Sequence, residues 1–346
     1  MAAKRFRAAF WLLCLAGVDA VGVVFAVLFF QNKQDVADAT KKSDDTRLTV
    51  LRLNGPAVEH KLDSQFQDAD GDLIADTPAD AAKQLDPATL TFSYVATEDP
   101  EIYQARWKNF TDYLFTVTGK PVEYMPFKRT DDELRAMKEG KLLVAGFNSG
   151  AVPAAVNHGG FVPVFQLGSG GSGPSCEIIV PADSTIGSPA DLKGRTLVFV
   201  DLNSNTGFKA PVSMLKEQYK MLPTDFDFIF SYGHEASIKG IATKQYPAAA
   251  VASDMLERAI ASKAIGSADF KVIYKSERFP TAAMGFAYNL KPELQAKIRK
   301  AFETYPWADG PLKQEFAAAG QAQFTATNYK KDWATIRTID NALGGP

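Results

Sequence analysis

The residues of this chain best suited to hold a ligand lie in a polar turn between an apolar run, Leu197–Val200, and the helix expected after it. The turn contains Ser204, Asn205, Thr206 and Gly207. Peptide N–H groups in the first turn of a helix lack partners within the helix, and the helix dipole adds partial positive charge there. Hydroxyl and amide side chains add donors. The turn therefore predicts a cradle for a tetrahedral oxyanion, although an ordinary helix cap uses the same residue types.

The length and composition of the chain predict a folded protein of about two domains, whose elements must position this turn. It has 346 residues, of which 46% are hydrophobic and 11% aromatic. A formal net charge of −2 gives no overall attraction to polynucleotides, and no basic face carries interleaved aromatic residues. We therefore do not expect nucleic acid as a partner.

Residues 1–31 are expected to form a membrane anchor or a signal segment. Basic residues precede an apolar run over Ala8–Phe30, interrupted by Asp19, that is long enough to cross a bilayer as a helix. The positive flank predicts a cytoplasmic N-terminus, with the rest of the chain on the outer, periplasmic face of a bacterial inner membrane. We favour an uncleaved anchor that holds the protein at the membrane; the alternative is cleavage after Ala39.

Residues 32–88 are predicted to be a polar linker that carries an acidic loop. The loop places four aspartates around Gly71, namely Asp68, Asp70, Asp72 and Asp76. Carboxylates at this spacing can gather oxygen ligands around calcium, although the pattern departs from that of an EF-hand. Calcium is the only cofactor that the sequence suggests, and the alternative is a solvated acidic linker.

From residue 89 onward, short strands alternate with amphipathic helices at α/β spacing. We expect a two-lobed fold like that of the periplasmic binding proteins, with the first lobe built on a parallel sheet. Its predicted parts are 89–181 for the first lobe, 182–275 for the second, and 276–346 for the return to the first lobe and the C-terminal helices. The predicted hinges lie at 180–182 and 274–276, and the ligand cleft lies between the lobes.

Several short motifs occur in the order typical of one transporter family. The family shows a turn of the form N-S-T-S-G, then G-H-[DE], then an acidic residue, then K-S-x-x-x-P. The corresponding residues here are Asn203–Gly207, Gly233–Glu235, Asp254, Lys275, Ser276 and Pro280. The stretch from about Leu90 to Trp307 thus resembles the periplasmic substrate-binding component of phosphonate, phosphite and phosphate ABC transporters.

The resemblance implies which residues touch the ligand. The turn residues Ser204, Asn205 and Thr206 would hold the phosphonate oxygens, and His234 would donate from its imidazole. A bound anion should favour protonated His234, so we expect its contribution to binding to be larger at pH 6 than at pH 8. From the first lobe, the backbone amide of Ser149 and that of the following glycine would add donors.

Departures from the family pattern bear on the identity of the ligand. Phe147 and Thr130 stand where the family tends to offer tyrosines, so both are candidate lining residues without a phenol. Asp254 keeps an acidic position that faces the ligand amine in aminoalkylphosphonate binders, but the expected aspartate after Pro280 is missing. The sequence therefore favours phosphate, phosphite or methylphosphonate over 2-aminoethylphosphonate. Tyr94 either lines the cleft or packs within the sheet.

The function implied by the resemblance is capture of a small phosphorus oxyanion outside the membrane and its delivery to an ABC transporter permease, without enzymatic chemistry. One alternative is a membrane-tethered sensor that uses the same cleft. Another is a hydrolytic enzyme with Cys176 as nucleophile and His234 as base, which we disfavour because an apolar strand raises the pKa of a thiol. Cys176 is expected to be a buried free thiol beside Ile178 and Ile179.

Overall fold

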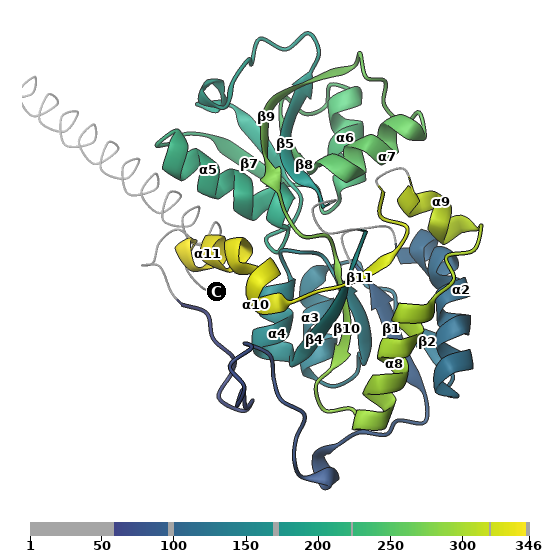
Figure 1. Ribbon diagram of the computed structural model, residues 1–346. Coiled ribbons are helices and arrows are strands. Elements are labelled where there is room, and N and C mark those ends of the chain that lie inside the picture. Colours follow the sequence, from purple (N-terminus) through teal and green to yellow (C-terminus); the bar gives the residue numbers. More distant parts are fainter. Residues whose placement is uncertain (1–58, 96–99, 169–172, 223, 318–319, 344–346) are drawn as a thin grey trace, which may run out of the picture. The chain divides into compact units, whose positions relative to one another are not determined.

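The computed structural model describes residues 59–95, 100–168, 173–222, 224–317 and 320–343 (Figure 1). The predicted membrane segment lies outside these ranges. Among the helices within them, none combines the length and the apolar character that a membrane crossing requires. The described residues after Asn54 belong to one compact unit that contains both lobes.

Lobe 1 is built on a six-stranded mixed sheet with the order β11-β4-β10-β3-β1-β2. The strands are β1 (Leu90–Tyr94), β2 (Val122–Tyr124), β3 (Val144–Phe147), β4 (Phe161–Leu167), β10 (Ala283–Ala287) and β11 (Phe324–Ala326). The helices of this lobe are α2 (Pro100–Thr118), α3 (Thr130–Lys138), α4 (Val152–Gly159), α8 (Pro292–Thr304) and α9 (Pro311–Ala317). The expectation of a parallel sheet is wrong in part, because β10 runs antiparallel between β3 and β4 and β11 pairs antiparallel with β4.

Lobe 2 is built on a five-stranded mixed sheet with the order β7-β6-β8-β5-β9. The strands are β5 (Ser175–Pro181), β6 (Thr196–Phe199), β7 (Asp227–Phe230), β8 (Ala249–Ala252) and β9 (Phe270–Arg278). The helices are α5 (Ala210–Gln218), α6 (His234–Ala242) and α7 (Ser253–Ala261). Strand β6 is parallel to β7 and β8, so the turn after β6 and the start of α7 after β8 meet at one edge of the sheet.

The chain crosses between the lobes twice, once between β4 and β5 and once between β9 and β10. The first crossing precedes Ser175, earlier than the boundary we expected after residue 181, and the second follows Arg278 rather than residue 275. The expected hinge residues instead lie within lobe 2, where Val180 pairs with Lys271 in the antiparallel ladder of β5 and β9. An apolar run predicts a strand, but it does not tell which sheet the strand joins.

The core of lobe 1 is rich in aromatic side chains that come from distant parts of the sequence. Trp107 of α2 is fully buried and packs on Phe92 of β1, with ring centroids 5.3 Å apart. Phe110 of α2 packs on Phe302 of α8 at 4.8 Å. Such aromatic contacts fix α2 and α8 against the sheet and against each other.

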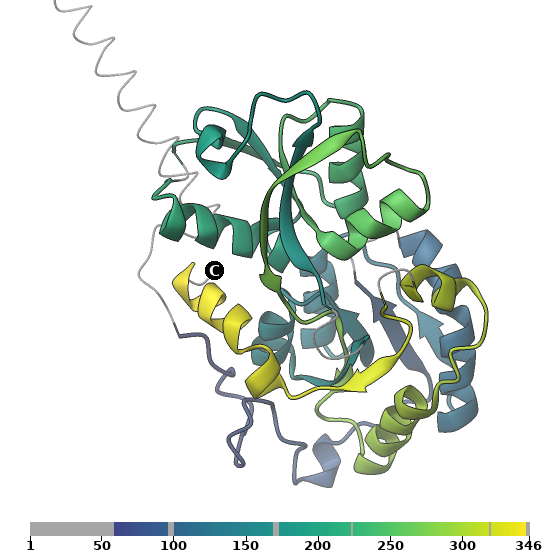
Figure 2. The ribbon, with the colours of Figure 1, turned by 45° about the horizontal axis from the view of Figure 1, so that its top comes forward.

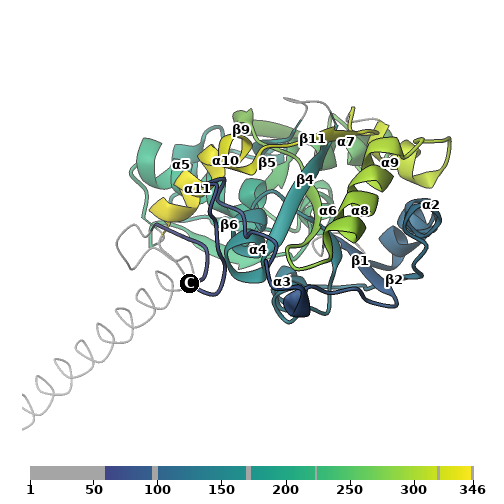
Figure 3. The same cartoon turned by 60° about the horizontal axis from the view of Figure 1, so that its bottom comes forward.

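Two C-terminal helices connect the lobes. These are α10 (Tyr329–Asp332) and α11 (Ala334–Ala342), and Figures 2 and 3 show α11 (yellow) alongside α5 (teal) of lobe 2. Trp333, between the two helices, donates its Nε1–H to Ser149 O of lobe 1 at 2.9 Å. Asp340 of α11 pairs with the buried Lys209 of lobe 2 at 2.5 Å. The two lobes are therefore held together by the C-terminal helices as well as by the two chain segments that cross between them.

Residues 59–88 pack on lobe 1, which differs from the predicted linker. Phe66 lies edge-on to Tyr288 with centroids 4.9 Å apart. Asp63 N–H donates to Asn157 O, and Leu85 forms a bridge with Leu290. Sparse hydrophobic residues in this stretch are thus enough to dock it.

Candidate functional site

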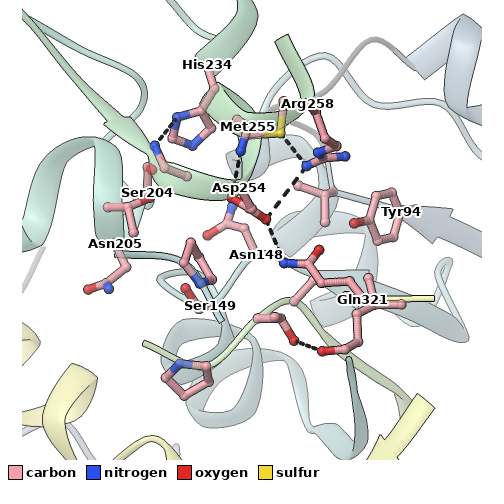
Figure 4. Close-up of a pocket in the computed structure, with 18 residues that line it drawn as sticks. Tyr94, Asn148, Ser149, Ser204, Asn205, His234, Asp254, Met255, Arg258 and Gln321 are labelled. Carbon is pink, nitrogen blue, oxygen red and sulfur yellow. Dashed lines mark hydrogen bonds and ion pairs between the residues drawn. The ribbon is translucent and has the colours of Figure 1, made fainter. Parts of the chain in front are cut away.

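A small cavity of about 60 Å³ lies where the two lobes meet (Figure 4). It is lined by Tyr94, Val95, Asn148, Ser149, Leu167, Pro174, Ser204, Asn205, Thr206, His234, Ala252, Asp254, Met255, Arg258, Pro280, Thr281, Ala282 and Gln321. One water needs about 10–15 Å³ by the same measure, so the space suits a guest with about four or five non-hydrogen atoms.

The predicted turn forms the lobe 2 wall of this cavity. It opens a single π-helical turn, η3 (Asn205–Lys209), that runs directly into α5. The Ser204 hydroxyl oxygen accepts from Gly207 N–H at 3.0 Å, so its own proton can be donated to a ligand. Helical geometry leaves the N–H groups of Asn205 and Thr206 without acceptors within the helix. The turn is thus both a helix cap and a set of hydrogen-bond donors. The oxyanion cradle and the ordinary helix cap, which the sequence offered as alternatives, are compatible in this structure.

His234 begins α6 and lines the same cavity. Its Nδ1 accepts from Ala252 N–H at 3.1 Å, which places the proton of the neutral ring on Nε2. Burial lowers the pKa of His234 to about 4, opposed in part by Asp254. Burial and the backbone donor at Nδ1, which the sequence expectation did not include, favour a neutral ring without ligand, with Nε2–H as its donor. Protonation of His234 beside a bound anion stays a prediction.

Lobe 1 contributes the loop before α4. The Asn148 side-chain oxygen accepts from Gly150 N–H and Ala151 N–H, at 3.1 and 3.0 Å. We expected the backbone amide of Gly150 to donate to a ligand, but Asn148 already accepts from it. The side-chain Nδ2 of Asn148, in contrast, is buried with no hydrogen-bond partner among the described residues. The sequence analysis did not predict Asn148 as a site residue, although an asparagine two residues before Gly150, where a helix was expected to begin, is a capping signal.

Helix starts surround the cavity. Ser204 caps η3, His234 begins α6, Asp254 lies in the first turn of α7, and Ser149 precedes α4. Each helix start carries partial positive charge, and the start of η3 adds unpaired N–H groups, so their convergence favours an anion.

Three predicted residues do not line the cavity. Phe147 is fully buried and packs on Phe161 with centroids 5.0 Å apart, and Thr130 is buried where α3 begins. Gly207 lies under the turn, where a Cβ would come within 3.0 Å of the Val200 side chain and of Ser204 Oγ. Tyr94 both lines the cavity and packs on Trp107, so the two alternatives for it coexist.

The acidic part of the cavity is a network across the lobes. Asp254 accepts from Gln321 Nε2 at 2.9 Å and lies 3.8 Å from Arg258 Nη2. Arg258 in turn pairs with Glu315 of lobe 1 at 2.7 Å. Sequence reasoning missed Arg258 and Gln321; only the spacing of Asp254 and Arg258, one helical turn apart, pointed to the first of them.

The acidic loop lies away from the cavity, on lobe 1. Asp68, Asp70 and Asp72 each offer a carboxylate oxygen within 4.8 Å of the others, whereas Asp76 is not part of this group and accepts from Ala69 N–H. Burial and the neighbouring carboxylates raise the pKa of Asp72, although an Ile74 N–H donor lowers it. Calcium binding here remains a prediction.

Cys176 is a free, fully buried cysteine on β5, as expected. Burial, together with Glu177, raises the pKa of its thiol far above the ordinary value. A thiol held in its neutral form is a poor nucleophile, which argues against the hydrolytic alternative.

Comparisons with known proteins agree with this geometry. Residues 92–333 match the family described as the periplasmic substrate-binding protein of phosphonate ABC transporters. A "Phosphate-import protein PhnD" from Mycolicibacterium smegmatis is 24% identical over 241 residues, which cover 66% of this chain and 75% of that protein.

Two solved structures share the fold. A binding protein component of an ABC phosphonate transporter from Pseudomonas aeruginosa aligns with a TM-score of 0.65 and 24% identity, over 73% of this chain and 86% of that chain. PhnD1 from Prochlorococcus marinus, in complex with methylphosphonate, aligns with a TM-score of 0.66 and 15% identity, over 75% and 99%. Since the family match spans well over half of its length, this chain belongs to the phosphonate-type periplasmic substrate-binding proteins of ABC transporters, which bind their ligand without transforming it.

Proposed function

We propose that the interlobe cavity binds one small phosphorus oxyanion, namely phosphate, phosphite or methylphosphonate. The cavity volume of about 60 Å³ suits a guest of this size. Ser204, Thr206 and His234 offer neutral donors from lobe 2, and the helix starts add their dipoles. In this proposal Ser204, Asn205 and Thr206 hold oxygens, as the resemblance implies.

The observation that carries the proposal is a pair of buried amides, one from each lobe, on residues that line the cavity. Asn148 of lobe 1 and Asn205 of lobe 2 have side-chain Nδ2 groups without hydrogen-bond partners among the described residues. A buried unsatisfied donor costs about 1–3 kcal/mol. An oxyanion between the lobes would accept from both groups at once, so its binding would favour the closed arrangement.

Delivery to a permease completes the proposed function. A permease that recognises the arrangement of two closed lobes would distinguish loaded from empty protein. In this proposal the N-terminal apolar run remains as an anchor, which keeps the protein at the outer face of the membrane close to its transporter.

Titration calorimetry on the purified chain tests the ligand assignment. We expect binding of at least one of phosphate, phosphite and methylphosphonate, and an affinity about 10-fold or more lower in Asn205→Ala, because a hydrogen bond to a charged group contributes about 1.5–3 kcal/mol. Asn109→Ala, on the exposed side of α2, is the matched control.

A second variant tests the donor from lobe 1 without removing the cap of α4. Asn148→Asp keeps an oxygen for Gly150 N–H and Ala151 N–H, but it removes the Nδ2 donor and places a negative charge beside the anion. We expect a larger loss than in Asn205→Ala. Wild-type affinity in both variants would remove these amides from the site.

A further inference from the structure

Asp254 is the one carboxylate among the described residues that line the cavity, and its oxygens already have partners. Its Oδ1 accepts from Met255 N–H at 2.9 Å, and its Oδ2 accepts from Gln321 Nε2 at 2.9 Å. Gln321 is 1% exposed and comes from lobe 1, after α9. Figure 4 shows its amide directed at Asp254 across the cavity. A ligand group that approached this carboxylate from the cavity would compete with Gln321 for Oδ2.

The charge of Asp254 is also balanced by an ion-pair cluster that begins at Arg258 in the cavity wall and extends beyond the cavity. Arg258, one turn along α7, donates from Nη1 to Glu315 Oε1 at 2.7 Å and to Tyr103 Oη at 3.0 Å. Arg106 of α2 pairs with the other oxygen of Glu315 at 2.7 Å. Two carboxylates thus face two guanidinium groups, and the four side chains are between 10% and 27% exposed. The cluster presents no uncompensated negative charge to the cavity.

We infer that Gln321 determines specificity: by occupying Asp254 from the opposite lobe, it makes the cleft reject phosphonates that carry an ammonium group. Asp254 then joins the two lobes instead of contacting the ligand. This inference rests on the proposed function and adds that the site excludes ligands with an ammonium substituent.

The physical basis is competition for one acceptor. An ammonium group brought beside Asp254 would compete with the Gln321 amide for Oδ2, and an amide that it moved aside would be buried without an acceptor. The ammonium group must also lie near Arg258, a like charge whose Nη2 is 3.8 Å from the Asp254 carboxylate. A ligand without an amine needs neither change, because its oxygens face the donors of the turn and His234.

The experiment compares two ligands by calorimetry. Methylphosphonate and 2-aminoethylphosphonate are titrated into the wild type, Gln321→Ala, and the control Gln323→Ala, which removes the same side chain from an exposed position two residues away. We expect the wild type and the control to prefer methylphosphonate, and Gln321→Ala to shift the ratio of the two dissociation constants about 10-fold toward 2-aminoethylphosphonate, since the freed carboxylate can accept from the ammonium.

A second variant keeps the result decisive if Gln321→Ala also loosens the contact between the lobes. Gln321→Glu places a second carboxylate beside Asp254, so we expect stronger binding of 2-aminoethylphosphonate and weaker binding of methylphosphonate. If both variants bind the two ligands with equally reduced affinity, Gln321 only holds the lobes together. That result would overturn the inference.

The outcomes for the wild type separate this inference from the proposed function. If the folded wild type binds 2-aminoethylphosphonate as tightly as methylphosphonate, the inference is overturned and the proposed function stands. If it binds no phosphorus oxyanion, the proposed function fails and the inference fails with it.

Discussion

Replacing Gly150 by alanine isolates the contribution of lobe closure to binding. Gly150 belongs to lobe 1, yet the three atoms nearest to an added Cβ would be Asn203 O, Asn205 N and Ser204 C, all within 3.0 Å. These are backbone atoms of lobe 2, which cannot move aside as a flexible side chain can. The backbone of Gly150 does not occupy the left-handed region, so alanine is compatible with its own lobe. We therefore expect Gly150→Ala to hold the lobes apart at the binding turn.

The magnitude follows from the contacts that such a separation stretches. Lys209 of lobe 2 donates from Nζ to Gly150 O at 2.7 Å, and its side chain is buried. A hydrogen bond to a charged group contributes about 1.5–3 kcal/mol, so its loss from the closed state predicts an affinity about 10- to 150-fold lower. The melting temperature should change little, because neither lobe is altered internally.

Calorimetry with methylphosphonate and a thermal melt of the ligand-free protein check both parts. Gly187→Ala is the matched control, because a Cβ there meets only Asp191 Oδ2, at an ordinary 3.8 Å. Undiminished affinity in Gly150→Ala would refute the reasoning that closure brings this glycine against the turn. A fall in melting temperature as large as in a core variant would place the effect within lobe 1 instead.

Two further predictions concern titratable groups. His234→Ala should weaken binding by about 1–3 kcal/mol, and the ratio of variant to wild-type affinity should be the same at pH 6 and pH 8, because burial lowers the pKa of His234 to about 4 and the ring is neutral at both; calorimetry that finds a clearly larger ratio at pH 6 would contradict a neutral donor. Asp201 lies buried just before the turn, and burial raises its pKa above the ordinary 3.8 although Asn203 N–H lowers it. A raised pKa means that the folded state holds the proton more tightly than the unfolded state, so this carboxyl lowers stability once the pH rises above 3.8. Asp201→Asn, which keeps an acceptor for Asn203 N–H, should therefore raise the melting temperature at pH 7 and less so at pH 4, and thermal melts that show no gain at pH 7 would rule out this destabilising charge.

Local patterns were enough to predict the elements, but not how they are assembled. The strand at Leu90–Tyr94 and the helix at His234 follow from short-range periodicity and capping signals. The place of β5 in lobe 2 depends on its pairing with β8 and β9, 70 or more residues further along the chain. In the same way, the docking of residues 59–88 depends on partners such as Tyr288, which no local window contains.

The same division explains which site residues the sequence revealed. Ser204 and Thr206 belong to a contiguous turn whose donors follow from helix geometry, so a motif identifies them. Gln321 meets Asp254 from 67 residues away, and Asn148 lines the same cavity as the turn although it belongs to the other lobe. The burial that lowers the pKa of His234 was not predicted for a related reason, since burial is a property of the assembled lobe. A motif that covers the turn therefore identifies an anion, whereas selection between anions depends on contacts from the opposite lobe that the motif does not contain.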